Sequence, residues 1–253
     1  MKKEPPCYDI SMKWILETGI VALLFSTVFL AKGRIRPFRR FVRDQRSVVS
    51  FGAGMAVAYV FVYLMPELHG ARRSFVDAVS MQLPYEGMVI YFLALVGFLV
   101  FYGIENLSTG SREAVEQGVG LKFKLHIGGF AAYACLIGFL LVHNIEETLL
   151  STALYATAII FHFVAVDHSL REEHGVDYDR IGRFVLAGAC MLGWGTGLMV
   201  VLPHYVLALL EAFISGAIII NSTIMELPGN KDGRFLPFAL GGIVYGLILV
   251  PLG

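Results

Sequence analysis

The chain has 253 residues, of which 57% are hydrophobic and 16% charged, and its mean hydropathy is +0.69. Soluble domains are usually about 45–50% apolar and about 25% charged, so this composition excludes an ordinary water-soluble core, a disordered chain and a coiled coil. The 20 Lys and Arg balance 20 Asp and Glu, which leaves no net charge to attract nucleic acid, and 3 cysteines provide no disulfide framework.

Eight apolar segments follow one another along the chain, and most are near the ~20 residues that a helix needs to cross a bilayer. They cover residues 14–31, 48–66, 87–103, 125–147, 149–168, 184–202, 206–225 and 235–252. None sustains the period-2 alternation of a β-barrel, and the connections between them are short. The sequence therefore predicts a single all-α integral membrane domain over residues 1–253, with eight transmembrane helices.

Basic residues set the expected orientation of these helices. Seven of them follow the first segment directly: Lys32, Arg34, Arg36, Arg39, Arg40, Arg43 and Arg46. A basic cluster of this size is retained in the cytoplasm, and no cleavage site of a signal peptide follows the segment. With that loop inside, 15 of the 20 basic residues fall in inside loops. Both termini are therefore predicted to lie outside a cell membrane, for which we expect the bacterial inner membrane.

An internal repeat links the second and seventh segments. Phe51, Gly54 and Pro66 recur as Phe213, Gly216 and Pro228, each 162 positions later. The two segments are five crossings apart and must run in opposite directions, which is the inverted repeat found in many secondary transporters. The alternative is two unrelated helices that share ordinary glycine packing and proline ends.

A group of metal-ligating residue types ends the fourth segment. His143, Asn144, Glu146 and Glu147 are spaced so that a helix places them on adjoining parts of one face. An imidazole, an amide oxygen and two carboxylates match the ligand preferences of a divalent cation. The alternative is a helix end that meets water, where polar residues cost little.

Ionisable residues elsewhere in the apolar segments are costly and are therefore functional candidates. His162 lies within the fifth segment, either as a further metal ligand or as a hydrogen-bonded structural histidine. Five further residues are candidates for a transport pathway or a secondary site, and the alternative is that they are solvated or packed helix residues. They are Asp167, His168, Glu67, Asn221 and Glu226. His126, near the start of the fourth segment, is interpreted as a solvated helix end.

At these residues the sequence resembles the ZIP family of divalent metal transporters. The family's fourth helix carries a His-Asn-x-Pro-Glu-Gly signature, and the matching stretch here is residues 143–148, which read His-Asn-Ile-Glu-Glu-Thr. The resemblance implies eight transmembrane helices with both termini outside and a homodimer. It also implies metal binding by His143, Asn144 and Glu147, with Zn, Mn, Fe or Co as the transported substrate and no organic cofactor.

The chain departs from the family pattern at several positions. Glu146 stands where the family has proline, and Thr148 where it has glycine. His162 matches a family histidine, but Val166 stands where a glutamate is expected. The sixth segment carries none of the family's carboxylates, so the usual two-metal centre is not expected to be intact.

The favoured hypothesis is a ZIP-like carrier in the lipid bilayer that moves divalent cations toward the cytoplasm by alternating access and is not an enzyme. The alternative keeps the fold without a complete two-metal site and acts as a metal sensor, a partner subunit or a carrier of another solute. A third and less favoured interpretation is a metal-dependent intramembrane hydrolase, which would require His143, Glu147 and His162 to converge.

Overall fold

The computed structural model describes residues 12–31, 45–79, 87–109, 119–143, 149–224 and 234–250, and within them every regular element is a helix. In chain order these are α1 (Met12–Leu30), α3 (Gln45–Tyr59), the π-helix η1 (Val60–Leu64), α4 (Met65–Val79), α5 (Met88–Thr109), α6 (Val119–His143), α7 (Leu149–Asp177), the π-helix η2 (Tyr178–Gly182), α8 (Arg183–Met199), α9 (His204–Ile224) and α10 (Phe235–Leu249). The predicted all-α class is confirmed for this part of the chain.

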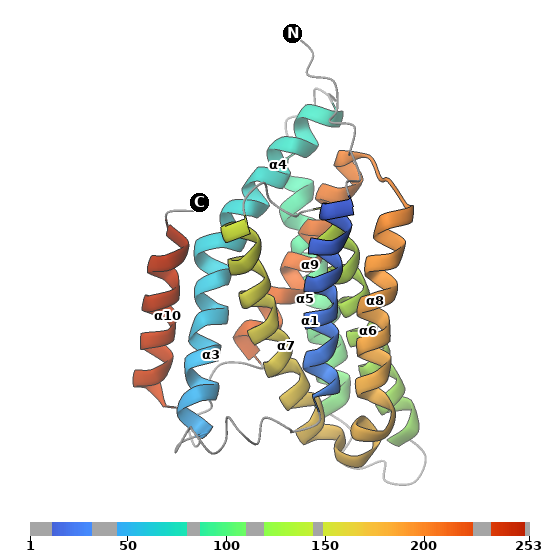
Figure 1. Cartoon of the computed structure of the whole chain (residues 1–253), viewed down its shortest axis with the longest axis vertical. Coiled ribbons are helices and arrows are strands. Elements are labelled where there is room, and N and C mark those ends of the chain that lie inside the picture. Colours follow the sequence, from blue (N-terminus) through green and yellow to red (C-terminus); the bar gives the residue numbers. More distant parts are fainter. Residues whose placement is uncertain are drawn as a thin grey trace.

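The long helices run side by side as one bundle, with α4 projecting at one end and α10 at the edge (Figure 1). The main core is built from apolar side chains of most of the helices, and its largest fully buried members include Phe25, Tyr133 and Phe163. A smaller core joins α4 to α5 and α9 through residues such as Leu68 and Phe75. Every described helix contributes side chains to at least one of these two cores.

Apolar side chains also cover the outside of the bundle. Six stretches are long and apolar enough to cross a membrane, namely Met12–Leu30, Ser50–Val79, Met88–Asn106, Lys122–His143, Thr152–Met199 and His204–Ser222. The shorter α10 exposes one apolar face, formed by Leu236, Leu240, Ile243 and Leu247. Such faces are stable against lipid rather than water. The chain is a multi-pass helical membrane protein; eight crossings and outside termini stay predictions.

The second helix is longer than expected. The sequence predicted that it ends at Pro66, but it continues through the π-helical turn η1 into α4 and ends at Val79. Proline lacks an amide proton, and its ring clashes with the carbonyl four residues earlier in a regular α-helix. A π-helical turn just before Pro66 widens the helix where that clash would occur. The prediction was wrong because packing of α4 on α5 and α9 outweighs the proline signal.

Other helix ends also differ from their predicted positions, and α5 continues to Thr109 rather than ending at residue 103. α6 begins at Val119 rather than at residue 125, and α7 continues to Asp177 rather than ending at residue 168. Both extensions carry charged residues, and Lys122 of one pairs with Glu173 of the other, with 3.6 Å between Nζ and Oε1. α8 stops at Met199, before residue 202, because the residue before Pro203 is disfavoured in a helix. The predicted residues 144–147 of the fourth segment lie outside the described part of the chain.

The stretch Thr152–Met199 contains two helices, because the chain reverses between α7 and α8 (Figure 1). Gly175 has φ of 50°, a left-handed conformation that favours glycine, and η2 follows it. The fifth and sixth predicted segments are therefore separate helices joined by a tight turn.

Glycines bring three helix pairs into backbone contact, and the first pair is α3 with α10. These two helices run in the same direction side by side (Figure 1). A Cβ atom on Gly54 would collide with the carbonyl oxygen of Phe238, and one on Gly241 would collide with that of Phe51. Only glycine fits at these positions, and close approach of this kind stabilises helix pairs in membranes, where lipid removes the hydrophobic drive for association.

The second pair, α5 with α9, repeats the same contacts. A Cβ atom on Gly216 would collide with the carbonyl oxygen of Ala94, and one on Gly97 would collide with that of Phe213. Each α9 residue lies 162 positions after its α3 equivalent, and each α5 residue lies 144 positions before its α10 equivalent. α3 and α9 run in opposite directions (Figure 1). The repeated sequence of the second and seventh segments therefore has a structural counterpart in inverted orientation.

The third pair, α6 with α8, has the same kind of glycine contact. A Cβ atom on Gly138 would collide with the carbonyl oxygen of Cys190, and one on Gly193 would collide with that of Cys135. Both cysteines are free thiols whose backbone, rather than sulfur, makes the interhelical contact. Three helix pairs of the described bundle are therefore in direct backbone contact.

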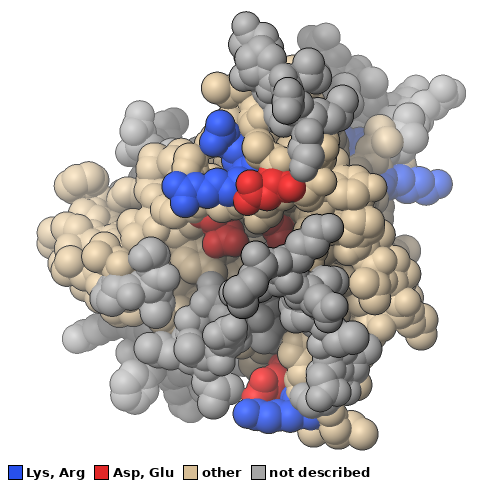
Figure 2. Space-filling view, turned by 90° about the horizontal axis from the view of Figure 1, so that it is seen from above, with Lys and Arg blue, Asp and Glu red and all other residues tan. Residues whose placement is uncertain are grey.

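The end of the molecule that carries α4 presents charges of both signs. Arg72, Arg73 and Asp77 lie on this helix. Viewed from above, blue and red atoms of the described residues lie next to one another, and further red atoms lie deeper in the view (Figure 2). The described part of this face therefore carries mixed charge rather than a patch of one sign.

Candidate functional site

His162 lies in the middle of α7 and is 2% exposed, so it is an interior residue of the bundle. Its Nε2 atom lies 2.6 Å from the hydroxyl oxygen of Tyr133, which comes from the middle of α6. A buried imidazole costs free energy unless it is hydrogen-bonded, and the tyrosine satisfies that requirement. His162 therefore fits the interpretation as a hydrogen-bonded structural histidine, while its role as a metal ligand stays a prediction.

Aromatic rings surround the contact between Tyr133 and His162. The Tyr133 ring packs 5.3 Å from Phe101 of α5 and 6.4 Å from Phe163 of α7, measured between ring centroids. Phe163 in turn lies 5.5 Å from Phe25 of α1. The contact thus lies where α1, α5, α6 and α7 meet, in an apolar setting that strengthens polar interactions.

His143 occupies the last position of α6 and is half-buried. Its ring stacks on Phe139 with centroids 4.7 Å apart, and its Nδ1 atom lies 3.1 Å from the Phe139 carbonyl oxygen, to which it donates. Tyr133, the partner of His162, lies ten residues before His143 on α6, which corresponds to about 15 Å of helical rise. The two predicted histidines therefore lie at different levels of the α6–α7 pair.

A second group of ligand-type residues lies at the opposite end of the same two helices. We call His126 of α6 with Glu173 and His174 of α7 the histidine–glutamate cluster; among the described residues no other three such side chains come this close together. The Nδ1 atom of His126 lies 2.8 Å from His174 Nε2 and 3.2 Å from Glu173 Oε2. His174 Nε2 lies 4.0 Å from Glu173 Oε1.

Two charged residues flank the histidine–glutamate cluster. Glu105, near the end of α5, places Oε2 3.4 Å from His126 Nε2, the ring nitrogen that faces away from His174. Lys122 places Nζ 3.6 Å from Glu173 Oε1. The His126 side chain is only 1% exposed, whereas those of Glu105 and Glu173 are 23% and 24% exposed. The cluster therefore joins the ends of three helices at the rim of the apolar core.

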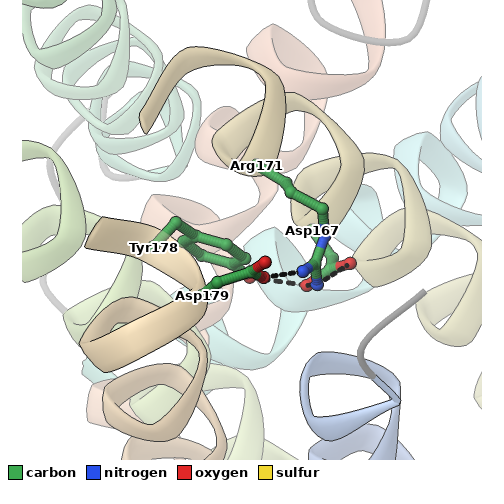
Figure 3. A network of polar contacts seen from close by, with 4 residues as sticks. All are labelled: Asp167, Arg171, Tyr178 and Asp179. Carbon is green, nitrogen blue, oxygen red and sulfur yellow. Dashed lines mark hydrogen bonds and ion pairs between the residues drawn. The ribbon is translucent and has the colours of Figure 1, made fainter. Parts of the chain in front are cut away.

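A neighbouring network holds the turn between α7 and α8 (Figure 3). Asp167 accepts hydrogen bonds from Arg171 Nη2 at 2.9 Å and from the Tyr178 hydroxyl at 2.7 Å. Arg171 also pairs with Asp179 of η2 and lies over the Tyr178 ring, 5.3 Å from its centroid. Asp167, predicted as a pathway or solvated residue, therefore bonds residues of this turn, while its pathway role stays a prediction. His168, one residue on, is exposed and pairs with Glu172 at 3.5 Å.

The remaining predicted residues are dispersed. Glu67 is exposed in the first turn of α4. Asn221 is 4% exposed in α9, and its Nδ2 atom has no hydrogen-bond partner among the described residues. Four predicted positions lie outside the described residues: Asn144, Glu146, Glu147 and Glu226.

Sequence reasoning missed the histidine–glutamate cluster. His126 was interpreted as a solvated helix end, but it is buried, and its neighbours come from positions about fifty residues away. One local signal was available: Lys122 and His126 are one helical turn apart, and Glu173 and His174 end the next long helix. Antiparallel neighbours of similar length bring those two ends together.

No known protein family, curated protein or solved structure matches this chain. The chemistry and positions of its own residues are therefore the grounds for a proposed function.

Proposed function

We propose that this protein is a carrier of divalent metal cations such as zinc, manganese, iron or cobalt across the membrane. The observation that carries the proposal is the buried contact between His162 and Tyr133 in the interior of a membrane-spanning bundle. Ionisable groups inside membrane helices are costly, and they commonly mark ion pathways.

Buried or half-buried imidazole groups occur at three levels along the α6–α7 pair, which supports a path along these helices. His126 and His174 lie at one end, His162 lies beside Tyr133, and His143 lies at the other end. Seven residues separate His126 from Tyr133, about 10 Å of rise, and ten separate Tyr133 from His143. Imidazole is a preferred ligand of zinc and of other late first-row divalent ions.

The inverted glycine pairs support an alternating-access mechanism. α3 with α10 and α9 with α5 are equivalent tight pairs of opposite direction. Inverted repeats let one half of a transporter adopt, on the opposite side, the conformation of the other half. Each pair is held by backbone contacts and would move as a unit, while sliding between pairs opens one side at a time.

A metal sensor that does not transport is the second candidate, and Val166 favours it. Val166 is 1% exposed, one helical turn after His162, where the ZIP resemblance expects a glutamate. An apolar residue there leaves fewer oxygen ligands beside His162 for a desolvated cation. A sensor would bind metal without passing it across the bilayer.

Uptake into proteoliposomes tests the carrier proposal. Vesicles that enclose a metal-sensitive dye receive Zn²⁺, Mn²⁺, Fe²⁺ or Co²⁺ outside, with protein-free vesicles as the blank. We expect uptake by the wild type and its loss in the double variant His143→Ala, Glu147→Ala. His69→Ala is the matched control, because this exposed α4 histidine contacts Tyr91 at 3.1 Å, away from the α6–α7 pair.

Equal uptake by the wild type and the double variant would exclude His143 and Glu147 from the transport path. Wild-type uptake no faster than the protein-free blank would remove the carrier proposal itself. In the second case, calorimetric titration with the same metals identifies the sensor, which binds metal at micromolar concentrations without uptake.

A further inference from the structure

We infer that the histidine–glutamate cluster is a binding site for one zinc-class divalent cation, with His126 Nδ1, His174 Nε2 and a Glu173 carboxylate oxygen as its ligands. The inference goes beyond the proposed carrier function, because the site is defined by its own geometry whether or not the protein transports metal. The ligand set of two imidazoles and one carboxylate also occurs in catalytic zinc sites, which leave a fourth position open.

The distances fit a small tetrahedral ion after minor adjustment. Zinc ligands lie about 2.0–2.2 Å from the metal, so two of them in a tetrahedron are about 3.4 Å apart. His126 Nδ1 lies 2.8 Å from His174 Nε2 and 3.2 Å from Glu173 Oε2, and His174 Nε2 lies 4.0 Å from the other Glu173 oxygen, Oε1. All three ligand atoms lie within 4.8 Å of one another, so rotation of the partly exposed Glu173 side chain would bring its oxygen into place.

Glu105 prepares His126 for this role. Its Oε2 atom faces Nε2 of the ring, while Nδ1 faces His174 and Glu173. A carboxylate at Nε2 favours the tautomer that carries its proton there, which directs the Nδ1 lone pair toward the cation. Metal-binding histidines are commonly oriented by a carboxylate on their other ring nitrogen. The orienting residue therefore comes from α5, and the ligands come from α6 and α7.

The local charge also favours a cation. With both imidazoles neutral, the carboxylates of Glu105 and Glu173 outnumber the Lys122 ammonium group, and Asp177 adds a further negative charge near His174, so these described groups carry a net negative charge. A divalent ion would balance that charge and replace the contact between the two imidazoles. The rival arrangement places a proton on His126, between the two carboxylates, and a cation must displace that proton before Nδ1 can act as a ligand.

The site lies where α7 ends and the chain turns into η2. His174 immediately precedes Gly175, and Phe123 packs on the His174 ring with centroids 5.2 Å apart. A bound ion would connect the start of α6 to this turn, at the end of the bundle that the sequence places in the cytoplasm. The cation is therefore expected to enter from that side and to hold the two helix ends together.

Titration of the purified full-length protein with Co²⁺ tests the inference. After chelator treatment in detergent, visible absorption reports cobalt held by nitrogen and oxygen ligands, and equilibrium dialysis counts bound ions. We expect the wild type to bind one more equivalent than His174→Ala and Glu173→Gln. Zn²⁺ should displace that equivalent and remove its visible absorption.

Matched variants separate the ligands from their surroundings. His168→Ala removes an exposed histidine from the same helix and should keep the wild-type stoichiometry. Glu105→Gln should keep the stoichiometry and weaken binding by about 10–100-fold, as expected for an orienting residue. Size-exclusion chromatography and circular dichroism verify folding, and the near-isosteric Glu173→Gln tests the site if His174→Ala does not fold.

Equal stoichiometry in the wild type, His174→Ala and Glu173→Gln would overturn the inference and leave the cluster as a protonated ion-pair network. This outcome differs from failure of the carrier proposal. A protein that shows the extra cobalt equivalent but no vesicle uptake retains the site without transport. Uptake with unchanged stoichiometry in the cluster variants retains transport without the site.

Discussion

Gly54 and Gly216 make the same backbone contact in two helix pairs that run in opposite directions. Each lies where a Cβ atom would collide with a carbonyl oxygen, of Phe238 for Gly54 and of Ala94 for Gly216. The spacing of 162 residues that relates the two glycines also relates Phe51 to Phe213, which take part in the reciprocal contacts. An internal duplication with inversion explains both relationships at once.

The Gly54 contact predicts a large effect of adding a single methyl group. Gly54→Ala should lower the stability of the folded protein by about 1–3 kcal/mol or more, because backbone atoms of α10 cannot move aside as a side chain would. Thermal unfolding in detergent measures the change. Gly195→Ala is the control: a Cβ atom there meets open space, and the substitution should be neutral or stabilising by up to about 1 kcal/mol. Equal melting temperatures for the two variants would contradict the tight packing of α3 on α10.

The contact between Tyr133 and His162 predicts a coupling energy. Tyr133→Phe removes the hydroxyl that bonds the buried imidazole and should cost about 1–3 kcal/mol. His162→Leu removes the other partner, and the double variant should cost less than the sum of the two single variants, because replacing both partners by apolar groups is tolerated. Denaturation of the three variants completes this double-mutant cycle.

An exposed tyrosine provides the reference for that cycle. Tyr102→Phe on α5 removes a hydroxyl from a residue that is 47% exposed. Its effect on the melting temperature should be small. Strict additivity of Tyr133→Phe and His162→Leu would show that the two side chains do not interact.

The network in Figure 3 predicts that the turn between α7 and α8 depends on Arg171. Arg171→Gln removes the cation that bridges Asp167 and Asp179, and the loss should be about 1–3 kcal/mol, typical of hydrogen bonds to charged groups. Hydrogen exchange should become faster over residues 175–182. Glu172→Gln is the control, since its side chain is 73% exposed and a surface pair contributes at most about 1 kcal/mol. Unchanged hydrogen exchange in Arg171→Gln would mean that the turn is held without this network, by the backbone conformation of Gly175.

Hydropathy was sufficient to locate the apolar segments, because burial in lipid acts on each stretch independently of its partners. It was insufficient at Pro66, where contacts of Leu68 and Phe75 with α5 and α9 keep the chain helical beyond a residue that usually ends helices. The repeat was detectable because Gly54 and Gly216 are required by backbone contact, a constraint that fixes residue type as well as position.

The histidine–glutamate cluster shows why a site is harder to predict than a fold. Glu105, His126 and His174 are far apart in sequence and meet only through the packing of three helix ends. In contrast, the predicted group at His143 is local in sequence and visible as a spacing. The spacing of residues along one helix predicts only the ligands that this helix contributes. The different levels of His143 and His162 in the bundle depend on how α6 and α7 pack against each other.

Metal uptake should decrease as the pH falls. Imidazole and carboxylate bind a cation only when deprotonated, so metal binding releases protons and weakens in acid. The measurement uses proteoliposomes with equal pH on both sides, so that no proton gradient drives transport, and a dye calibrated at each pH. Uptake that rises steadily toward pH 5.5 would exclude histidine ligands from the rate-limiting binding step and would point to a path lined by uncharged oxygen ligands.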